Sequence, residues 1–133
     1  MSAEKAIYLD SSAIVKLAVH EPGSAALRRY VRRRRPLISS ALARTEVARA
    51  LLLLGSGVVQ RGQEVLARLE LARVNDWVLT AAGKLLPAGL RSLDAIHLAT
   101  ALELGSDLTR FVTYDERMAA AARGLGLAVS APE

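Results

Sequence analysis

The sequence predicts an α/β fold, with a central, mostly parallel, twisted sheet of about four to five strands and helices on both faces. Short apolar runs alternate with longer segments of helical pattern along the chain, which is the order expected of a parallel sheet. The 133 residues fit a single domain, residues 1–133. Because 52% of the residues are hydrophobic, this domain can form a core without disulfides or structural metals.

The alternation predicts each element in order. Strands are expected where the sequence reads KAIYLD, PLIS, WVLT, RFVTY and LAVS, at 5–10, 36–39, 77–80, 110–114 and 127–130. Helices are expected at 11–19, 24–34, 40–54, 57–73, 92–104 and 115–123. Pro36, Gly55 and Gly105 mark helix ends, and Ser92 is expected to cap the helix that follows it.

Composition excludes several classes of site. The chain has no cysteine, so disulfides, zinc–thiolate sites and thiol nucleophiles are absent. The first residues, MSAEKAIYLDSS, lack the pattern of a signal peptide, and no apolar run is long enough to span a membrane. These features predict a cytoplasmic protein without contact to a membrane.

The net charge of +5 comes almost entirely from arginine, with 15 Arg beside three Lys among the 18 basic residues. Arginine suits the recognition of phosphate because its planar fork can bind two oxygens. A polyanionic partner is therefore plausible, and the group Arg28–Arg35 is either an RNA backbone contact or a solvated surface. The sequence does not decide between the two.

Acidic residues follow two of the expected strands. Asp10 ends the first, and Asp115 comes directly after RFVTY. Ligands bind outside the carboxyl ends of strands in an open parallel sheet, so both acids are predicted on one edge. Asp94 lies in the first turn of a helix. Glu46 lies inside another, on a stripe that is otherwise mostly apolar, where a carboxylate is costly unless it is paired or bound to a metal.

Each acid also has a purely structural explanation. Asp10 and Asp115 are good helix N-caps. Asp94 is favoured by the helix dipole. Glu46 has Arg44 and Arg49 nearby and can be a paired surface acid. Taken singly, the acids therefore decide nothing, whereas their joint placement at strand ends and helix starts is informative.

Four stretches together resemble a known family. They are YLDSSAIVKL, SSALARTEVARAL, RSLDAIHLATAL and FVTYDERMAAAARGLGLAV, and each contains one of the four acids. In this order and with these separations, they resemble the PIN-domain ribonucleases, and most closely the VapC toxins of toxin–antitoxin pairs. The resemblance covers nearly the whole chain. It implies a single PIN domain.

The resemblance implies a catalytic, metal-binding site formed by Asp10, Glu46, Asp94 and Asp115, with Asp115 at the position that varies most in the family. It also implies one or two Mg²⁺ or Mn²⁺ ions, an RNA substrate, and a cognate VapB antitoxin that inhibits the enzyme. Oxygen ligands suit these hard cations, and the lack of cysteine disfavours zinc. Four carboxylates without a cation would repel one another.

Neighbouring residues have less specific roles. Ser12 and Thr113 are candidates for hydrogen bonds to the carboxylates, or small residues in tight turns. His97, one turn after Asp94, is either a proton shuttle or a packed helix residue. The leucine run 51–54 is expected to be buried partly in a homodimer or against an antitoxin, within a larger toxin–antitoxin complex.

Three other functions compete with an endoribonuclease. A PIN module that binds protein or nucleic acid without cutting would not need all four acids. A nuclease of the same fold that acts on DNA remains open, because metal-assisted hydrolysis does not require the 2′-hydroxyl. A phosphoacceptor receiver domain is disfavoured, because the first strand ends in LDSS, without an acidic pair, and no lysine follows Lys84.

Overall fold

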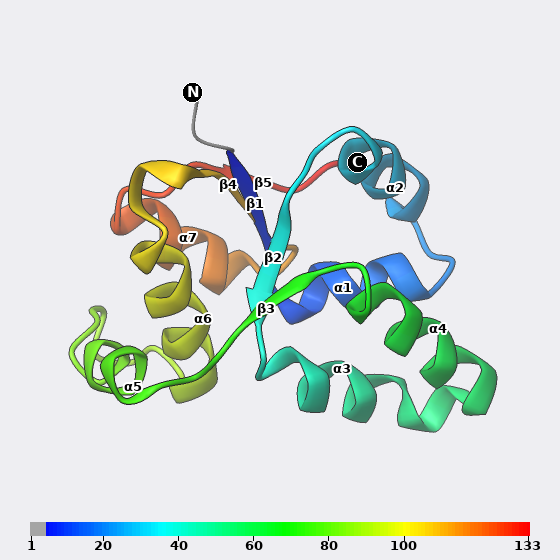
Figure 1. Ribbon diagram of the computed structural model, residues 1–133, viewed down its shortest axis with the longest axis horizontal. Coiled ribbons are helices and arrows are strands. Elements are labelled where there is room, and N and C mark those ends of the chain that lie inside the picture. The colour runs from blue at the N-terminus through cyan, green and yellow to red at the C-terminus, as the bar shows by residue number, and fades with distance from the viewer. Residues whose placement is uncertain (1–4) are drawn as a thin grey trace.

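The computed structural model describes residues 5–133, and its sheet has five parallel strands in the order β3-β2-β1-β4-β5 (Figure 1). The strands are β1 (Ala6–Leu9), β2 (Leu37–Ser40), β3 (Glu70–Ala72), β4 (Leu108–Val112) and β5 (Val129–Ser130). The α-helices are α1 (Ser11–Ala18), α2 (Ser24–Arg32), α3 (Ala43–Leu51), α4 (Ser56–Leu66), α5 (Asp76–Ala82), α6 (Ser92–Glu103) and α7 (Glu116–Gly124), with short 3₁₀ turns at Leu52–Leu54 and Gly105–Asp107. The predicted α/β class is confirmed.

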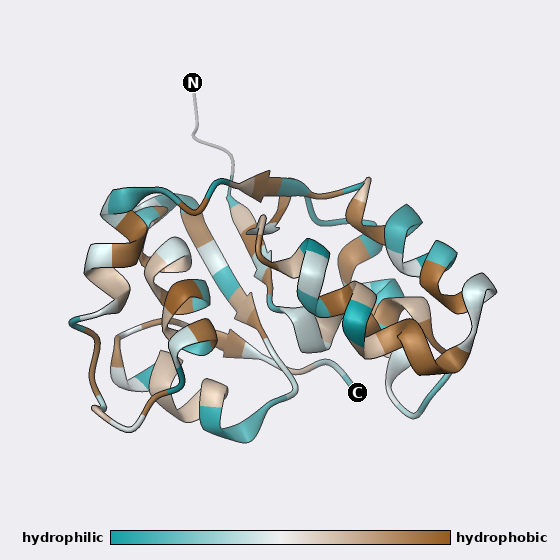
Figure 2. Ribbon diagram, turned by 90° about the horizontal axis from the view of Figure 1, so that it is seen from below, coloured by the Kyte–Doolittle hydropathy of each residue, from teal (hydrophilic) through white to brown (hydrophobic). Residues whose placement is uncertain are grey.

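The two helical layers follow from side-chain alternation along the central strand. Ile7 and Leu9 of β1 pack into the core beneath α1, α2, α3 and α4, whereas Ala6 and Tyr8 face the core shared with α6 and α7. β1 is buried on both faces, as expected for the middle of a parallel sheet. Figures 1 and 2 show the sheet between the two helical layers, with hydrophobic residues on its strands.

Two predicted elements are wrong. The stretch 77–80, expected as a strand, lies within α5, because the Asn75 side chain accepts a hydrogen bond from the backbone N–H of Val78 and caps a helix there. The helix expected over 57–73 ends at Leu66, and Glu70–Ala72 form β3 instead. β3 is a short, partly exposed edge strand, so its residues carry little of the apolar signal of a buried strand.

Smaller differences concern helix starts and ends. Ser92 is the first residue of α6 and not its cap, since Arg91 occupies the cap position without a side-chain hydrogen bond. The helix expected over 40–54 divides into α3 and the 3₁₀ turn Leu52–Leu54. Among the described helices, none is long and apolar enough to cross a bilayer.

Gly62 allows α4 to pack closely on α3. A Cβ atom at this position would lie 2.5 Å from Cδ1 of Leu51 and 3.2 Å from Cγ1 of Val47, and both of these side chains are buried. We therefore expect Gly62→Ala to reduce the free energy of unfolding by about 1–3 kcal/mol through overpacking. Chemical denaturation measures the change. Gly57→Ala is the matched control in the same helix, because nothing lies within 4 Å of its added Cβ. The control should be neutral or slightly stabilising, and equal losses in both variants would contradict the packing argument.

Candidate active site

Asp10 lies at the carboxyl end of β1 and caps α1. Its side chain is 3% exposed, and its Oδ1 accepts hydrogen bonds from the Ser12 hydroxyl at 2.6 Å and from the backbone N–H of Ala13 at 3.0 Å. The Thr113 hydroxyl donates to Oδ2. The backbone N–H of Asp10 donates to Val112 at 3.2 Å, which ties the residue to β4. Asp10 is therefore a helix cap and also a rigidly held carboxylate.

Burying the Asp10 carboxylate costs free energy, and hydrogen bonds from its neighbours offset part of this cost. Burial raises the pKa of Asp10, and the hydrogen bonds from Ser12, Thr113 and Ala13 offset this only in part. A helix cap does not require a buried acid, because asparagine or serine caps as well as aspartate does. The buried negative charge is thus an energetic cost that capping alone does not explain.

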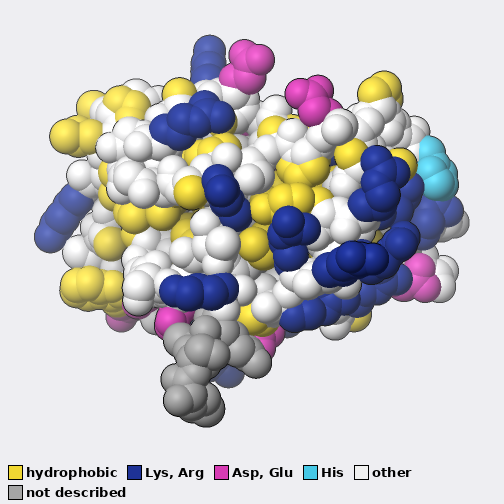
Figure 3. Space-filling model, turned by 90° about the horizontal axis from the view of Figure 1, so that it is seen from above, with side chains coloured by type: hydrophobic (Ala, Val, Ile, Leu, Met, Phe, Trp, Pro, Cys, Tyr) yellow, Lys and Arg dark blue, Asp and Glu magenta, His cyan; other side chains and the backbone are white. Residues whose placement is uncertain are grey.

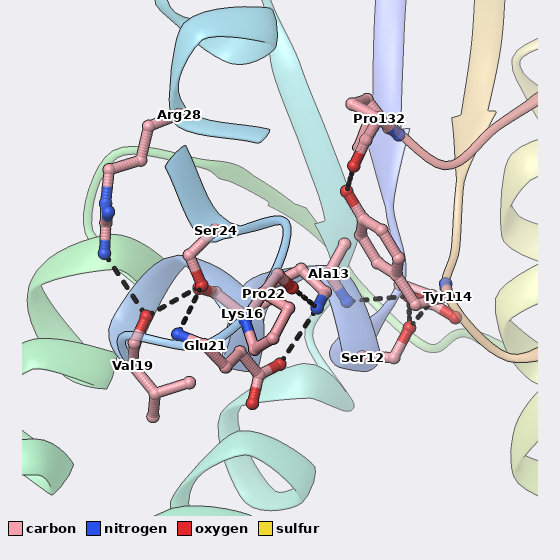
Figure 4. Close-up of polar contacts among 11 residues, drawn as sticks. Ser12, Ala13, Lys16, Val19, Glu21, Pro22, Ser24, Arg28, Tyr114 and Pro132 are labelled. Carbon is pink, nitrogen blue, oxygen red and sulfur yellow. Dashed lines mark hydrogen bonds and ion pairs between the residues drawn. The ribbon is translucent and has the colours of Figure 1, made fainter. Parts of the chain in front are cut away.

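Ser12 and Thr113 connect Asp10 to the end of β4. Ser12 accepts a hydrogen bond from the backbone N–H of Tyr114 at 3.0 Å, a contact seen in Figure 4. Thr113 accepts one from the backbone N–H of Asp115 at 3.1 Å. Asp115 itself is exposed and caps α7, and its Oδ1 accepts from the backbone N–H groups of Arg117 and Met118. The two hydroxyl side chains thus fix the strand ends that carry Asp10 and Asp115.

Asp94 projects from the first turn of α6 and is half-buried. Burial raises the pKa of Asp94, and the negative charges of Asp115 and, less strongly, Asp10 add to the rise, while Arg91 opposes it. Asp94 therefore lies close enough to Asp115 and to Asp10 to be affected by both negative charges. The carboxyl edge of the sheet therefore gathers negative charge from β1, α6 and α7.

Glu46 occupies the mostly apolar stripe of α3 because two side chains hold it. Its Oε1 accepts hydrogen bonds from the Ser11 hydroxyl and from Nε2 of His97, both at 2.6 Å. Burial acts to raise the pKa of Glu46, but these hydrogen bonds outweigh it and hold the pKa below its usual value. Glu46 is therefore kept ionised. The alternative pairing with Arg44 or Arg49 is not found among the ion pairs of residues 5–133.

The four acids offer the oxygen donors that a hard divalent cation prefers, but they do not surround a common point closely. Within residues 5–133, no three His, Cys, Asp or Glu side chains converge closely enough to surround one ion. Mg²⁺, however, keeps several waters and uses only one or two carboxylates. Asp94 and Asp115 repel each other, and a cation bound by one or two carboxylates would relieve this repulsion. The donor set thus fits Mg²⁺ or Mn²⁺, whereas the residues that would hold the ion stay a prediction.

Sequence reasoning missed two participants. Ser11 donates to Glu46 and not to its neighbour Asp10, and Tyr8 contacts His97, with its hydroxyl 2.7 Å from Nδ1. The sequence around Tyr8 gave no sign of its contact with His97, because the two residues are 89 positions apart in the chain. His97 is packed and hydrogen-bonded, with 1% exposure, which is the structural alternative considered for it.

An open cavity of 770 Å³ adjoins Asp94. Its lining is mainly apolar, from Leu86, Leu90, Ala121 and Leu125, and includes the two exposed arginines Arg91 and Arg117. The cavity therefore combines apolar surface with positive charge next to the acidic site. Such a combination suits a nucleotide, which has an apolar base face and an anionic phosphate.

The group Arg28–Arg35 lies away from these acids. Arg35 directly precedes Pro36 and the amino end of β2, whereas the acids lie at the carboxyl ends of parallel strands. Figure 3, seen from above in the view of Figure 1, shows Lys and Arg side chains gathered on the side where α2 lies. Three of these arginines already bond backbone carbonyls, since Arg28 donates to Val19, Arg34 to Tyr30 and Arg35 to Val31. An RNA contact by this group stays a prediction.

Thr113→Val tests whether the hydroxyl that links Asp10 and Asp115 matters for the site. The change keeps the shape of the side chain but removes one donor to Asp10 and one acceptor for the N–H of Asp115. We expect Mn²⁺ affinity to fall by about 10- to 100-fold, as for other partners that orient metal-binding carboxylates. Calorimetric titration measures the affinity. Thr109→Val in β4 is the control, because Thr109 is exposed and lies near the amino end of the strand, away from the acids. Unchanged affinity in Thr113→Val would refute the linking role.

Comparison with known proteins agrees with this geometry. The PIN domain model matches residues 7–124. The chain is 64% identical over 127 residues to Ribonuclease VapC46 of Mycobacterium tuberculosis, which covers 96% of this chain and 98% of that protein. It is 43% identical over 130 residues to Ribonuclease VapC35 of the same species, covering 95% and 96%.

A solved structure supports the fold. The crystal structure of M. tuberculosis VapC20, a toxin that cleaves the sarcin–ricin loop, matches with a TM-score of 0.72 over 86% of this chain and 94% of that chain. At 15% identity, this likeness is evidence of the fold alone. The family match spans most of the chain and the VapC relatives match it almost end to end, so the chain belongs to the PIN domain family and, within it, to the VapC ribonucleases.

Proposed function

We propose that this chain is the toxin of a VapBC-type pair and acts as a metal-dependent endoribonuclease inhibited by a cognate VapB antitoxin. One observation carries the nuclease proposal: a buried and rigidly held carboxylate, Asp10, lies at the carboxyl edge of the sheet near Asp94, whose pKa the negative charges of Asp115 and Asp10 help to raise. This repulsion is a cost that a bound cation would relieve. The names of the relatives, ribonucleases of the VapC group, support the same function.

Asp10, Glu46, Asp94 and Asp115 are the residues that would hold one or two Mg²⁺ or Mn²⁺ ions. When bound, such a cation offsets the charge on the phosphate and makes a water molecule more acidic. The chain supplies the positions of the oxygens: Ser12 and Thr113 fix Asp10, and Ser11 and His97 fix Glu46. Arg91 and Arg117, beside Asp94, are suited to bind the phosphates of an RNA strand.

The direct test is cleavage of a labelled RNA pool by the purified chain, free of antitoxin, with Mg²⁺, with Mn²⁺ and with EDTA. Discrete fragments that require a divalent cation are expected. Single-stranded and duplex DNA of matched length are offered in parallel, because DNA cleavage would indicate the related nuclease. No metal-dependent cleavage by folded protein, together with binding of nucleic acid, would instead indicate a binding module that no longer cuts.

Homodimerisation is proposed to use the leucines Leu52, Leu53 and Leu54, which are 58%, 97% and 57% exposed. A contiguous apolar patch of this kind is costly in water and favours association. We expect wild-type protein to be a dimer and Leu53→Asp to be a monomer, with light scattering coupled to size-exclusion chromatography as the measurement. Leu86→Asp is the control, because Leu86 is also exposed but lies in the loop between α5 and α6. A wild-type monomer, or a dimer of Leu53→Asp, would contradict the proposal.

A further inference from the structure

His97 occupies the middle of a buried polar chain that reaches Glu46. The chain joins side chains from three elements: Tyr8 of β1, His97 of α6 and Glu46 of α3. The Tyr8 hydroxyl lies 2.7 Å from Nδ1 of His97, and Nε2 lies 2.6 Å from Oε1 of Glu46. His97 is 1% exposed and Tyr8 is fully buried, so water does not compete for the contact between these two side chains.

Tyr8 is itself held in place. Its ring stacks on Phe111, with the centroids 5.1 Å apart and the planes 5° apart, and meets the His97 ring edge-on at 5.8 Å. Burial raises the pKa of the Tyr8 phenol, so the hydroxyl keeps its proton. Tyr8 is therefore a fixed hydroxyl group aimed at Nδ1.

The partners determine where the proton of a neutral imidazole lies. Glu46 is ionised and can only accept, so Nε2 must carry the proton and donate it to Oε1. Nδ1 is then an acceptor, and the Tyr8 hydroxyl donates to it. Ser11 also donates to Oε1, and its oxygen lies 3.3 Å from Nε2. Oε1 thus has two donors, while the hydrogen bonds among residues 5–133 include none to Oε2.

We propose that His97 is a positioning residue: held as the Nε2–H tautomer between Tyr8 and Glu46, it fixes Oε1 of Glu46 and leaves Oε2 free to bind at the acidic site. This inference rests on the proposed function, since it assigns Glu46 to the metal-binding site. A histidine that merely fills the core would be replaceable by an apolar side chain of similar size. A positioning histidine requires a donor at the place of Nε2.

The first experiment reads the tautomer directly in the metal-free, full-length chain. Long-range ¹H–¹⁵N correlation spectra, recorded where the imidazole is neutral, are expected to show a protonated Nε2 and an unprotonated Nδ1 for His97. In Tyr8→Phe, which lacks the donating hydroxyl, Nε2 is expected to keep its proton because Glu46 still accepts from it, while the ¹⁵N shift of Nδ1 should move because this nitrogen loses its hydrogen bond. A wild-type ring protonated on Nδ1 would overturn the proposal, and this reading is independent of metal and activity.

The second experiment measures Mn²⁺ affinity for three variants of the whole chain. His97→Leu is expected to weaken binding by about 10- to 100-fold. His97→Gln is expected to restore affinity to within a few-fold of wild type, because the glutamine amide nitrogen can donate at the place of Nε2. Ser24→Ala is the control for lost stability: it removes part-buried hydrogen bonds to the carbonyls of Lys16 and Val19 (Figure 4), and neither residue bonds to Glu46 or His97. Its melting temperature should fall with its Mn²⁺ affinity unchanged.

The possible outcomes distinguish a failure of the positioning role of His97 from a failure of the proposed nuclease function. Wild-type affinity in folded His97→Leu, or equal losses in the Leu and Gln variants, would overturn the positioning role while the nuclease stands. A wild-type chain that binds no Mn²⁺ and cuts no RNA would overturn the proposed function, whatever tautomer His97 shows. If His97→Leu does not fold, the spectra of wild type and Tyr8→Phe still decide the proposal.

Discussion

Asp10→Asn is expected to abolish RNA cleavage and at the same time to stabilise the metal-free protein. The loss of activity should be on the order of 10³-fold or more, because the variant lacks the most buried carboxylate of the proposed metal site. The gain in stability follows because asparagine keeps the cap of α1, accepting from the N–H of Ala13, while the buried charge disappears.

The pH dependence distinguishes this explanation from a general change in packing. Burial raises the pKa of Asp10, so the stability that its protonated form contributes is fully present below the pKa of the unfolded chain and is lost as the pH rises through the folded-state pKa. The advantage of Asp10→Asn in thermal unfolding should therefore be largest above that folded-state pKa. It should shrink as the pH falls through it.

Addition of Mn²⁺ supplies the control. A ligand that binds only the folded state raises its stability, so Mn²⁺ should raise the melting temperature of wild type and leave Asp10→Asn nearly unchanged. Ser24→Ala should respond to Mn²⁺ as wild type does, because Ser24 bonds only groups around α1 and α2. Retained metal-dependent cleavage by Asp10→Asn would remove Asp10 from the site and leave it as a helix cap.

The edge of the sheet could be predicted from sequence because the apolar stretches that form β1 and β4 are each followed by an acid. Ala6–Leu9 and Leu108–Val112 are central, adjacent and parallel, so Asp10 and Asp115 follow from chain order alone. β3 could not be predicted, because an exposed edge strand of Glu70, Leu71 and Ala72 uses residues that equally suit a helix. α5 was hidden because its residues Trp77, Val78 and Leu79 favour a strand by local preference, and the Asn75 cap decided otherwise.

The contacts that orient the acids depend on tertiary structure. Glu46 is recognisable as an anomaly on an apolar stripe, but its partner His97 is 51 residues away, and only the folded chain brings the two side chains together. Ser11 and Ser12 are neighbours in sequence and point to different acids, since one donates to Glu46 and the other to Asp10. Local spacing cannot separate two such hydroxyl groups, whereas the first turn of α1 does.

Phe111→Ala is expected to cause the largest loss of stability, about 3–5 kcal/mol. Phe111 is fully buried in β4, within the core shared with α6 and α7, and its ring stacks on Tyr8. Because the net stability of a domain is commonly about 5–15 kcal/mol, such a loss is a large fraction of the whole. Urea denaturation, monitored by circular dichroism, measures it.

The position of Phe111 also links this core to the acidic edge. Without its stacking partner, Tyr8 is no longer held with its hydroxyl toward Nδ1 of His97, so Mn²⁺ affinity should fall even at temperatures where Phe111→Ala is fully folded. Phe111→Leu is the matched control: it retains more of the buried volume, so its loss of stability should be smaller, but it lacks the ring. If Phe111→Leu loses less stability than Phe111→Ala but the same Mn²⁺ affinity, then the aromatic stack serves the site and not only the core. Wild-type Mn²⁺ affinity in both variants would show that Phe111 serves only to pack the core. The hydrogen bonds from Tyr8 through His97 to Glu46 would then not depend on the aromatic stack.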